Sequence, residues 1–241
     1  MDKQRLDQAL VEVGLVSTRS QAESYIKLGY VTVNNRIITK PGYSVQPNDV
    51  SSIRINIEDQ YVSRAALKLG SVAHGLKLNF KGKTVLDVGS STGGFTDYSL
   101  RHGAAKVIAV DIGTDQMHPS LRGDSRIDLH EKTDIRDFKT SESLDIIVMD
   151  VSFISLREIL PPVSRLASKK TQLVAMVKPQ FEARRSKIKH QGVIKNDRLR
   201  RQVLKDFEDW VSQDFIVRDK LDSAVSGAKG NQERFYLLQK A

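Results

Sequence analysis

The stretch KTVLDVGSSTGGFTD, at residues 83–97, decides the fold of this chain. Val85, Leu86 and Val88 form an apolar run broken only by Asp87, which is typical of a strand buried on both faces of a parallel sheet. A turn rich in glycine and serine follows, and then a helix start, whose free N–H groups can hold polar or anionic ligand groups. The stretch predicts a nucleotide-like ligand at a strand end, with a plain tight turn as the alternative.

The spacing of the glycines separates this turn from two common nucleotide-binding motifs. Gly89, Gly93 and Gly94 permit positive φ angles and a close approach of the backbone to a ligand. Their G-x-x-x-G-G pattern is not the G-x-G-x-x-G of dinucleotide-binding folds, and it lacks the Lys-Ser/Thr pair of a Walker A loop. The turn alone therefore leaves the kind of ligand open.

Apolar segments and helical segments alternate along the rest of the chain. This alternation predicts an α/β fold with a mostly parallel, seven-stranded sheet and helices on both faces. Pro161 and Pro162 should break or kink the helix in which they lie. After the first strand, the expected strands are 106–110, 127–130, 144–149, 173–177, 215–219 and 234–238, and the expected helices are 95–101, 155–166 and 196–210.

Charged side chains stand where several of these strands end. Asp111, Asp134, Asp150 and Lys178 each follow an expected strand, and ligands of such sheets bind beyond those ends. Asp111 lies roughly 20 residues past the turn, where doubly wound folds place a carboxylate on ribose hydroxyls. The alternative for Asp111 is an acid that merely starts the next helix.

The composition favours an anionic partner. The 241 residues carry a formal net charge of +9, which suits nucleic acid or a membrane surface, although a generic basic protein would show it too. The chain has no cysteine, which excludes disulfides and thiolate metal sites, and we expect no metal. Because the N-terminus lacks an apolar signal core and no run reaches the roughly 18–20 residues of a membrane helix, we expect a cytoplasmic protein without membrane contact.

Residues 1–57 show the pattern of a separate small α+β unit. Two short helices precede a hairpin with the turn Asn34-Asn35, and residues 50–57 are expected to form a closing strand. This order and the segment RLDQALVEVGLVSTRSQAESYIKLGYVTVNNRIITKPGYSVQPND resemble the S4 RNA-binding domain. The resemblance implies contacts to RNA backbone, against the alternative of solvated surface charges; the matching basic residues are Arg5, Arg19, Lys27 and Lys40.

Residues 58–62 are the expected linker, and 63–241 the second domain, beginning with a helix capped by Ser63. In this domain DVGSSTGGFTD resembles the first motif of class I S-adenosylmethionine-dependent methyltransferases, and VDIG the second. The resemblance implies S-adenosylmethionine as cofactor, with Asp111 on its ribose and Asp134 near its adenine. The implied cofactor-binding residues are Asp87, Gly89, Ser90, Ser91, Thr92, Gly93, Gly94, Phe95, Asp111, Asp134 and Asp150.

Four further segments resemble the Lys-Asp-Lys-Glu tetrad of the FtsJ-like ribose methyltransferases. They are SRAALKL with Lys68, VMDVSF with Asp150, MVKPQFE with Lys178 and GAKGNQERFYLL with Glu233. An S4 unit joined to such a domain resembles the TlyA family, also labelled hemolysin A. That family implies 2′-O-methylation of ribosomal RNA, with cytidine as the target nucleotide.

These residue types fit that chemistry. A ribose hydroxyl is a weak nucleophile, so its attack on a methyl group needs alignment and removal of a proton. We expect Lys178 to be the base or to orient the hydroxyl, and Lys68 to assist it or to hold phosphate. Asp150 would orient the lysine, and Glu233 would complete the charge network. Structural salt bridges or a phosphate clamp are the alternatives, and Glu182 is a rival carboxylate.

Basic residues are dense just past Lys178. Residues 178–201 hold nine Lys and Arg against two acids, and a basic loop there would guide an RNA backbone into the site, although a solvated loop would look alike. The candidates for RNA contact outside the S4 unit are Arg64, Arg184, Arg185, Lys187 and Lys189.

Ribosomal RNA or a ribosomal subunit is therefore the expected partner, and the sequence leaves the oligomeric state open. The competing functions are a non-catalytic RNA-binding or ribosome-assembly protein with a vestigial methyltransferase fold, a hemolysin, and an S4-linked pseudouridine synthase. The last class uses no such glycine turn.

Overall fold

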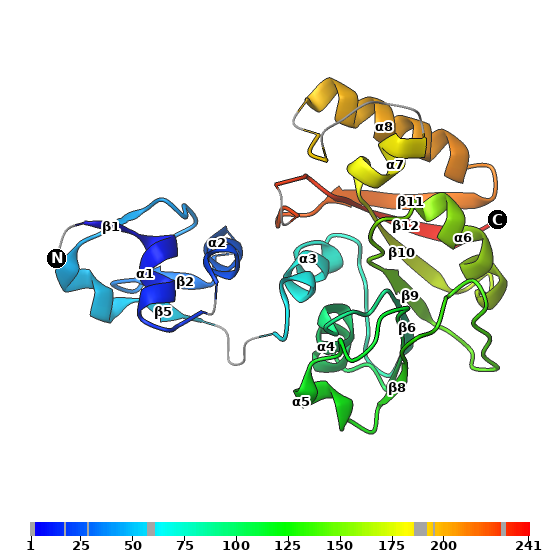
Figure 1. Cartoon of the computed structure of the whole chain (residues 1–241), viewed down its shortest axis with the longest axis horizontal. Coiled ribbons are helices and arrows are strands. Elements are labelled where there is room, and N and C mark those ends of the chain that lie inside the picture. Colours follow the sequence, from blue (N-terminus) through cyan, green and yellow to red (C-terminus); the bar gives the residue numbers. More distant parts are fainter. Residues whose placement is uncertain are drawn as a thin grey trace. The chain divides into compact units, whose positions relative to one another are not determined.

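A computed structural model of the chain divides into two compact units, Met1–Arg64 and Ala65–Ala241 (Figure 1). The structure describes residues 3–16, 18–27, 29–56, 61–185, 192–194, 196–227 and 230–241, without the side chains of Ser20, Arg184 and Arg185.

The first unit packs two short helices with two small antiparallel sheets. Thr18 caps the second helix, because its hydroxyl oxygen accepts a hydrogen bond from the Gln21 N–H at 3.2 Å. Asn34 and Asn35 have φ of 51° and 60°, as a tight hairpin turn requires. The sheets have the orders β3-β2-β5 and β1-β4. The elements are β1 (Gln4–Arg5), α1 (Leu6–Glu12), α2 (Arg19–Lys27), β2 (Val31–Val33), β3 (Arg36–Ile37), β4 (Ser44–Val45), the 3-10 helix η1 (Pro47–Ser52) and β5 (Arg54–Ile55).

The expected closing strand at 50–57 is wrong over its first half. Residues 50–52 belong to η1, and the strand β5 covers only Arg54–Ile55. Pro47 presets the φ angle that starts this helical turn, and the Ser52 hydroxyl donates a hydrogen bond to the Asp49 carbonyl at 2.6 Å. These local bonds compete with strand pairing.

The second unit is built on a seven-stranded sheet of order β11-β12-β10-β9-β6-β7-β8. All neighbouring pairs are parallel except those of β12, which runs antiparallel to both β10 and β11. The predicted mostly parallel α/β sheet is therefore confirmed. The strands are β6 (Thr84–Val88), β7 (Lys106–Val110), β8 (Ile127–His130), β9 (Ile146–Met149), β10 (Gln172–Val177), β11 (Phe215–Asp222) and β12 (Arg234–Lys240).

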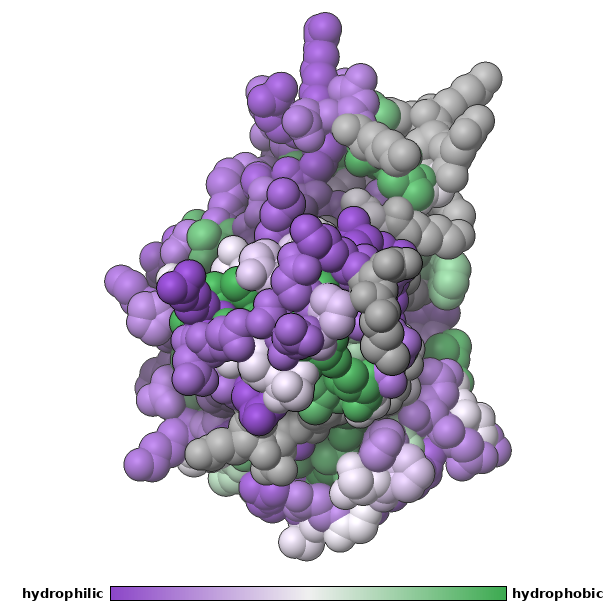
Figure 2. Space-filling view, turned by 90° about the vertical axis from the view of Figure 1, so that its left-hand side faces the viewer, coloured by the Kyte–Doolittle hydropathy of each residue, from purple (hydrophilic) through white to green (hydrophobic). Residues whose placement is uncertain are grey.

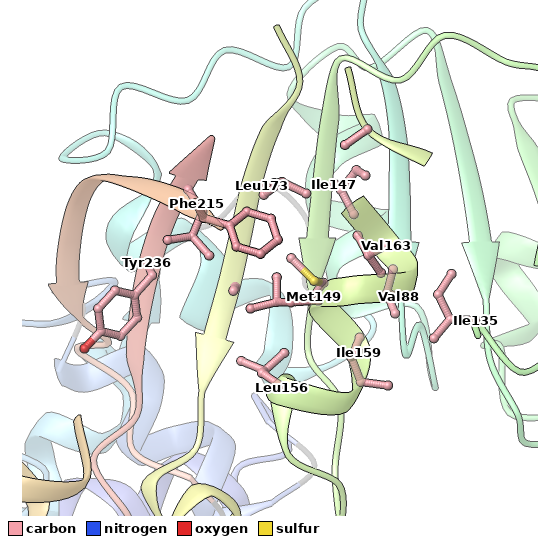
Figure 3. Close-up of a cluster of buried hydrophobic side chains, with 14 of the residues drawn as sticks. Val88, Ile135, Ile147, Met149, Leu156, Ile159, Val163, Leu173, Phe215 and Tyr236 are labelled. Carbon is pink, nitrogen blue, oxygen red and sulfur yellow. The ribbon is translucent and has the colours of Figure 1, made fainter. Parts of the chain in front are cut away.

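Helices cover both faces of this sheet. On one face Leu156, Ile159 and Val163 of α6 pack with Val88 and Met149 from the strands (Figure 3). α8 adds its own buried side chains to the same cluster. On the other face the Phe95 ring of α4 lies 6.0 Å from that of Phe235. The helices are α3 (Arg64–Ala73), α4 (Gly94–Arg101), α5 (Pro119–Arg122), α6 (Leu156–Leu166), α7 (Pro179–Arg185) and α8 (Asp197–Val211).

Two expectations about helices need correction. α6 runs without a break through Pro161 and Pro162, although each proline removes a helical donor. Leu160, Pro162 and Val163 are buried on the sheet, so tertiary packing offsets the lost bonds. The second correction concerns the basic stretch after Lys178, which is not a loop from its start, because residues 179–185 form α7.

The molecular surface is mostly hydrophilic on the face shown in Figure 2, with small apolar areas between. Among the described residues, the large apolar side chains that are exposed are Val13, Ile37, Tyr43, Ile112, Phe153 and Ile216. Within the same residues, no helix has the length and apolar character needed to cross a membrane.

Candidate functional site

The glycine-rich turn between β6 and α4 brings the backbone close to its neighbours. Gly89 has a φ of 80°, and a Cβ there would lie 3.0 Å from the carbonyl oxygen of Asp150. Gly93 has a φ of 90°, and a Cβ there would overlap the Met117 sulfur. Any larger side chain would push the turn away from the β9 end, so the glycines keep the space above the strand ends open.

A cavity of about 470 Å³ opens beside this turn, at the carboxyl ends of the parallel strands. Such a volume lies in the range of small-molecule sites. Its walls combine apolar side chains such as Ile135 with polar groups from Asp111, Gln116, Asp134 and Arg136. The cavity therefore lies where a doubly wound sheet binds its ligand.

Asp111 and Asp134 both line this cavity, and their carboxylates are held by different hydrogen-bond donors. The Asp111 carboxylate accepts hydrogen bonds from the backbone N–H groups of Ser91 and Gly113, at 2.8 and 2.7 Å, which ties the second strand end to the glycine turn. Asp134 is held by the guanidinium of Arg136, whose Nε lies 3.0 Å from Oδ1. These hydrogen bonds from Arg136 hold the pKa of Asp134 below its usual range.

A second cavity, of about 130 Å³, adjoins the first and shares Gly89, Ser91, Asp150 and Ser152 with it. Its remaining walls come from the glycine turn, from α3 and from the end of β10. These remaining lining residues are Ala65, Asp87, Ser90, Thr92, Phe95 and Lys178.

Two polar atoms in the second cavity's walls are buried with neither a hydrogen bond nor an ion pair in the described part of the chain. They are Oδ1 of Asp87 and Oγ of Ser90. The other carboxylate oxygen of Asp87 accepts a hydrogen bond from the Thr96 hydroxyl at 2.7 Å. Burial raises the pKa of Asp87 to about 7. Unpaired buried polar atoms are costly, so this wall suits a ligand that supplies a cationic donor.

The two adjoining cavities fit a nucleoside joined to an amino acid. The larger one has room for an adenosine, with polar groups from Asp111, Gln116 and Asp134. The smaller one offers the unpartnered Asp87 and Ser90 atoms to an ammonium and carboxylate end. The residues present are therefore compatible with the size and polarity of S-adenosylmethionine.

Lys178, at the end of β10, points its ammonium at two acceptors. Its Nζ lies 2.6 Å from Oδ1 of Asp150 and donates a hydrogen bond to the Ser152 hydroxyl at 2.7 Å. Lys178 is only 8% exposed, yet it lines the second cavity with Asp150 and Ser152. The pair thus stands at a cavity wall instead of in a sealed core.

Lys68 and Glu233 form a second buried ion pair, with Nζ 2.7 Å from Oε2. Neither residue lines the two cavities, but Ala65, one turn before Lys68 on α3, does. A Cβ on Gly227 would lie 2.7 Å from the other oxygen of Glu233, so this glycine leaves room for the carboxylate. The structure therefore pairs the four tetrad positions two by two.

The expected cofactor-binding residues are largely brought together. All of them line one or both cavities except Gly93 and Gly94, which instead form the start of α4. The rival carboxylate Glu182 lines neither cavity. It accepts hydrogen bonds from the Ser155 hydroxyl at 2.6 Å and from the Leu156 N–H at 2.8 Å, at the first turn of α6. Burial raises the pKa of Glu182.

The basic residues expected to contact RNA fall into three groups. Arg5 and Arg19 both donate to the buried carboxylate of Asp7, at 2.9 Å from Arg5 Nη2 and from Arg19 Nε. Lys27 and Lys40 are exposed and Arg64 is half-buried. Arg184 and Arg185 lie on α7 with undescribed side chains, while Lys187 and Lys189 lie outside the described residues.

Sequence reasoning missed several residues of the site, among them Gln116, Arg136, Ser152 and Phe153. Phe153 is 81% exposed, adopts a φ of 68°, and its ring lies 5.5 Å from that of Phe181. A bulky residue with positive φ is uncommon and often marks a functional site. The only signal in the sequence was position, because Ser152 and Phe153 lie two and three residues after Asp150.

The comparisons with known proteins agree with this architecture. The fold and the cavity at the strand ends define a class I methyltransferase domain that follows an S4 domain. A model of the S4 domain matches residues 4–51, and a model of the FtsJ-like methyltransferase matches residues 61–240.

Two curated relatives and one solved structure resemble most of the chain. The 23S rRNA (cytidine-2′-O)-methyltransferase TlyA of Campylobacter jejuni is 40% identical over 182 residues, which cover 75% of this chain and 71% of the relative. Hemolysin A of Brachyspira hyodysenteriae is 36% identical over 95% of this chain and 97% of its own. A solved structure of a protein assigned as a hemolysin, from Streptococcus thermophilus, has a TM-score of 0.72 and 34% identity, covering 100% of this chain and 90% of its own. The chain therefore belongs to the TlyA family of FtsJ-like methyltransferases.

Proposed function

We propose that this chain transfers a methyl group from S-adenosylmethionine to the ribose 2′-hydroxyl of a nucleotide in ribosomal RNA, with cytidine as the target base. The observation that carries the proposal is the Lys178–Asp150 pair, which stands in the wall of a cavity continuous with the nucleoside-sized cavity. The name of the Campylobacter relative supports the choice of cytidine. We propose that this methylation takes place in the cytoplasm, where ribosomes are assembled.

The cofactor supplies an electrophilic methyl group on a sulfonium. Asp111 would hold its ribose, and Asp134 with Arg136 would border its adenine. Asp87 and Ser90 would receive its amino-acid end, because Asp87 Oδ1 and Ser90 Oγ are buried without a partner in the described residues. We therefore propose that the expected cofactor-binding residues that line the two cavities contact the cofactor, and that Gly93 and Gly94 shape the turn.

Lys178 would act on the acceptor hydroxyl. In its neutral form it takes up the hydroxyl proton, and in its charged form it orients the oxygen through a hydrogen bond. Asp150 holds Nζ at 2.6 Å and so limits the positions the long side chain can adopt. Lys68, fixed by Glu233, would add positive charge near the backbone phosphate.

The first unit would bring RNA to this site. We propose residues 1–57 as an S4 RNA-binding domain, 58–62 as a linker and 63–241 as the catalytic domain. Arg5, Arg19, Lys27, Lys40 and Arg64, together with the basic residues at 184–189, would contact the RNA backbone. Contacts to phosphate position a nucleic acid without reading its sequence.

The test is a methylation assay on ribosomal subunits purified from a strain that lacks this chain. With S-adenosylmethionine labelled in its methyl group, the wild-type protein should produce 2′-O-methylcytidine, detected by nucleoside mass spectrometry of the digested RNA. Lys178→Ala should lower the rate by about 100-fold or more, because it removes the base. Lys170→Ala, at an exposed turn, is the matched control and should keep the wild-type rate.

Two outcomes would contradict the proposal. Full methylation by Lys178→Ala would show that this lysine is not the base. Absence of any 2′-O-methylation by the wild-type protein, on either subunit, would favour a non-catalytic RNA-binding protein.

A further inference from the structure

Ser152 is a second residue, beside Asp150, that contacts Lys178 from the cavity wall. It lines both cavities, and its hydroxyl oxygen accepts a hydrogen bond from Lys178 Nζ at 2.7 Å. Asp150 forms an ion pair with the same nitrogen, with Oδ1 at 2.6 Å from Nζ. The lysine is therefore held between two oxygens that come from one short loop after β9.

We infer that Ser152 is a positioning residue that aims Lys178 at the acceptor hydroxyl, an inference that rests on the function proposed above. A lysine side chain has four rotatable bonds, and a single acceptor leaves Nζ free to swing about the contact. The directional hydrogen bond to Ser152, added to the ion pair with Asp150, limits the positions that Nζ can take.

The loop that carries Ser152 is itself anchored at both ends. At its start the Asp150 N–H donates to the Val88 carbonyl of β6, at 3.1 Å. At its far end the Glu182 carboxylate receives the Ser155 hydroxyl and the Leu156 N–H. Since Glu182 and Lys178 lie one helical turn apart on the same segment, the lysine and its two acceptors share a single rigid frame.

Ser152 is an uncharged hydrogen-bond partner of Lys178, whereas Asp150 is its charged partner. Asp150 neutralises the ammonium, and this ion pair would remain after a substitution of Ser152. The aromatic ring of Phe181, 5.8 Å from Nζ, adds a weak cation–π contact without direction of its own. Loss of the hydroxyl should therefore disturb the aim of Lys178 more than its charge.

Ser152 is exposed, so its replacement should leave folding intact. We expect Ser152→Ala to lower the single-turnover methylation rate roughly tenfold, because misplacement of a catalytic group slows the chemical step. The KM for the ribosomal subunit and the dissociation constant of S-adenosylmethionine should change less than about twofold, because the side chain acts through Lys178. Ser152→Thr keeps the hydroxyl and should restore the rate to within about threefold of wild type.

The matched control is Ser164→Ala, at a half-buried serine of α6 whose hydroxyl donates a hydrogen bond to the Pro161 carbonyl, away from both cavities. It should leave rate, KM and cofactor affinity unchanged. A wild-type rate in Ser152→Ala would overturn the inference, and so would a low rate in Ser152→Thr equal to that of the alanine variant. A wild-type protein without methylation activity would instead contradict the proposed function, so the two failures are distinguishable.

Discussion

Burial of Asp87 beneath the glycine-rich turn gives an ordinary carboxyl group a pKa of about 7. The shift arises mainly from lost hydration, and the Thr96 hydrogen bond opposes it only in part. Because this folded-state pKa lies above the usual value of 3.8, the free energy of unfolding contributed by Asp87 is fully present below about pH 4. That contribution declines as the pH rises to about 7.

The same titration should govern cofactor binding. Above pH 7 the unpartnered oxygen of Asp87 is anionic and can pair with the ammonium of S-adenosylmethionine. We expect the affinity for S-adenosylmethionine to rise roughly tenfold between pH 6 and pH 8, as measured by titration calorimetry.

Asp87→Asn is the control for this prediction, because it keeps the shape of the side chain and removes the charge. It should bind the cofactor more weakly and with little dependence on pH over that range. If the variant kept the pH dependence of the wild type, another group would be responsible.

Among the secondary-structure elements, α6 and α7 are coupled by one side chain. Glu182 of α7 is buried and receives the two donors at the start of α6, and Arg157 lies 3.7 Å from its carboxylate. This is a capping interaction supplied by another helix. It holds the loop that carries Asp150 and Ser152 against the segment that carries Lys178.

Glu182→Ala should therefore destabilise the protein and slow methylation together. Removal of the carboxylate leaves the Ser155 hydroxyl and the Leu156 N–H without their partner, which should lower the free energy of unfolding by about 2–3 kcal/mol. Urea denaturation measures the stability, and the methylation assay measures the rate.

Glu142→Ala is the matched control for the effect of losing a glutamate. Glu142 is exposed and forms a surface ion pair with Lys106 at 2.9 Å, which should contribute little to the free energy of unfolding. A loss of stability in Glu182→Ala no larger than that in the control would refute the coupling of the two helices.

At the scale of the whole molecule, the chain combines an S4 domain and an FtsJ-like methyltransferase domain in one sequence with net charge +9. The chain divides into two compact units, Met1–Arg64 and Ala65–Ala241. Binding of RNA by the first unit and of cofactor by the second should thus be separable by mutation.

Lys27 and Lys40 offer a clean test of this division, because both are exposed on the first unit and Asp7 does not engage them as it does Arg5 and Arg19. The double variant Lys27→Ala/Lys40→Ala should bind ribosomal RNA several-fold more weakly, and the slope of log K against log salt should become shallower by about 1 to 2. Affinity for S-adenosylmethionine should not change.

Lys81→Ala, at an exposed position of the second unit, serves as the control for loss of a positive charge. Filter binding at several salt concentrations measures the slope. An unchanged slope in the double variant would show that these lysines do not touch phosphate.

The sequence alone determined the class of fold and pointed to many of the residues that line the two cavities. Buried parallel strands require long apolar runs, and a tight turn at a ligand requires glycine, so both leave a local pattern. The hairpin turn at Asn34-Asn35 could be predicted for the same reason. Short elements such as β1, β4 and α5 could not be predicted, because two to four residues are too few to show a periodicity.

The tertiary structure decided what each side chain does. Only packing shows that α6 continues through two prolines, that Glu182 caps a helix instead of competing for catalysis, and that Ser152 contacts Lys178. It also decided that Lys178 pairs with Asp150 and Lys68 with Glu233. These contacts join residues 26 to 165 positions apart, and no local pattern of a single sequence records such pairs; they exist because the strand order β12-β10-β9-β6 brings distant strand ends to one edge of the sheet.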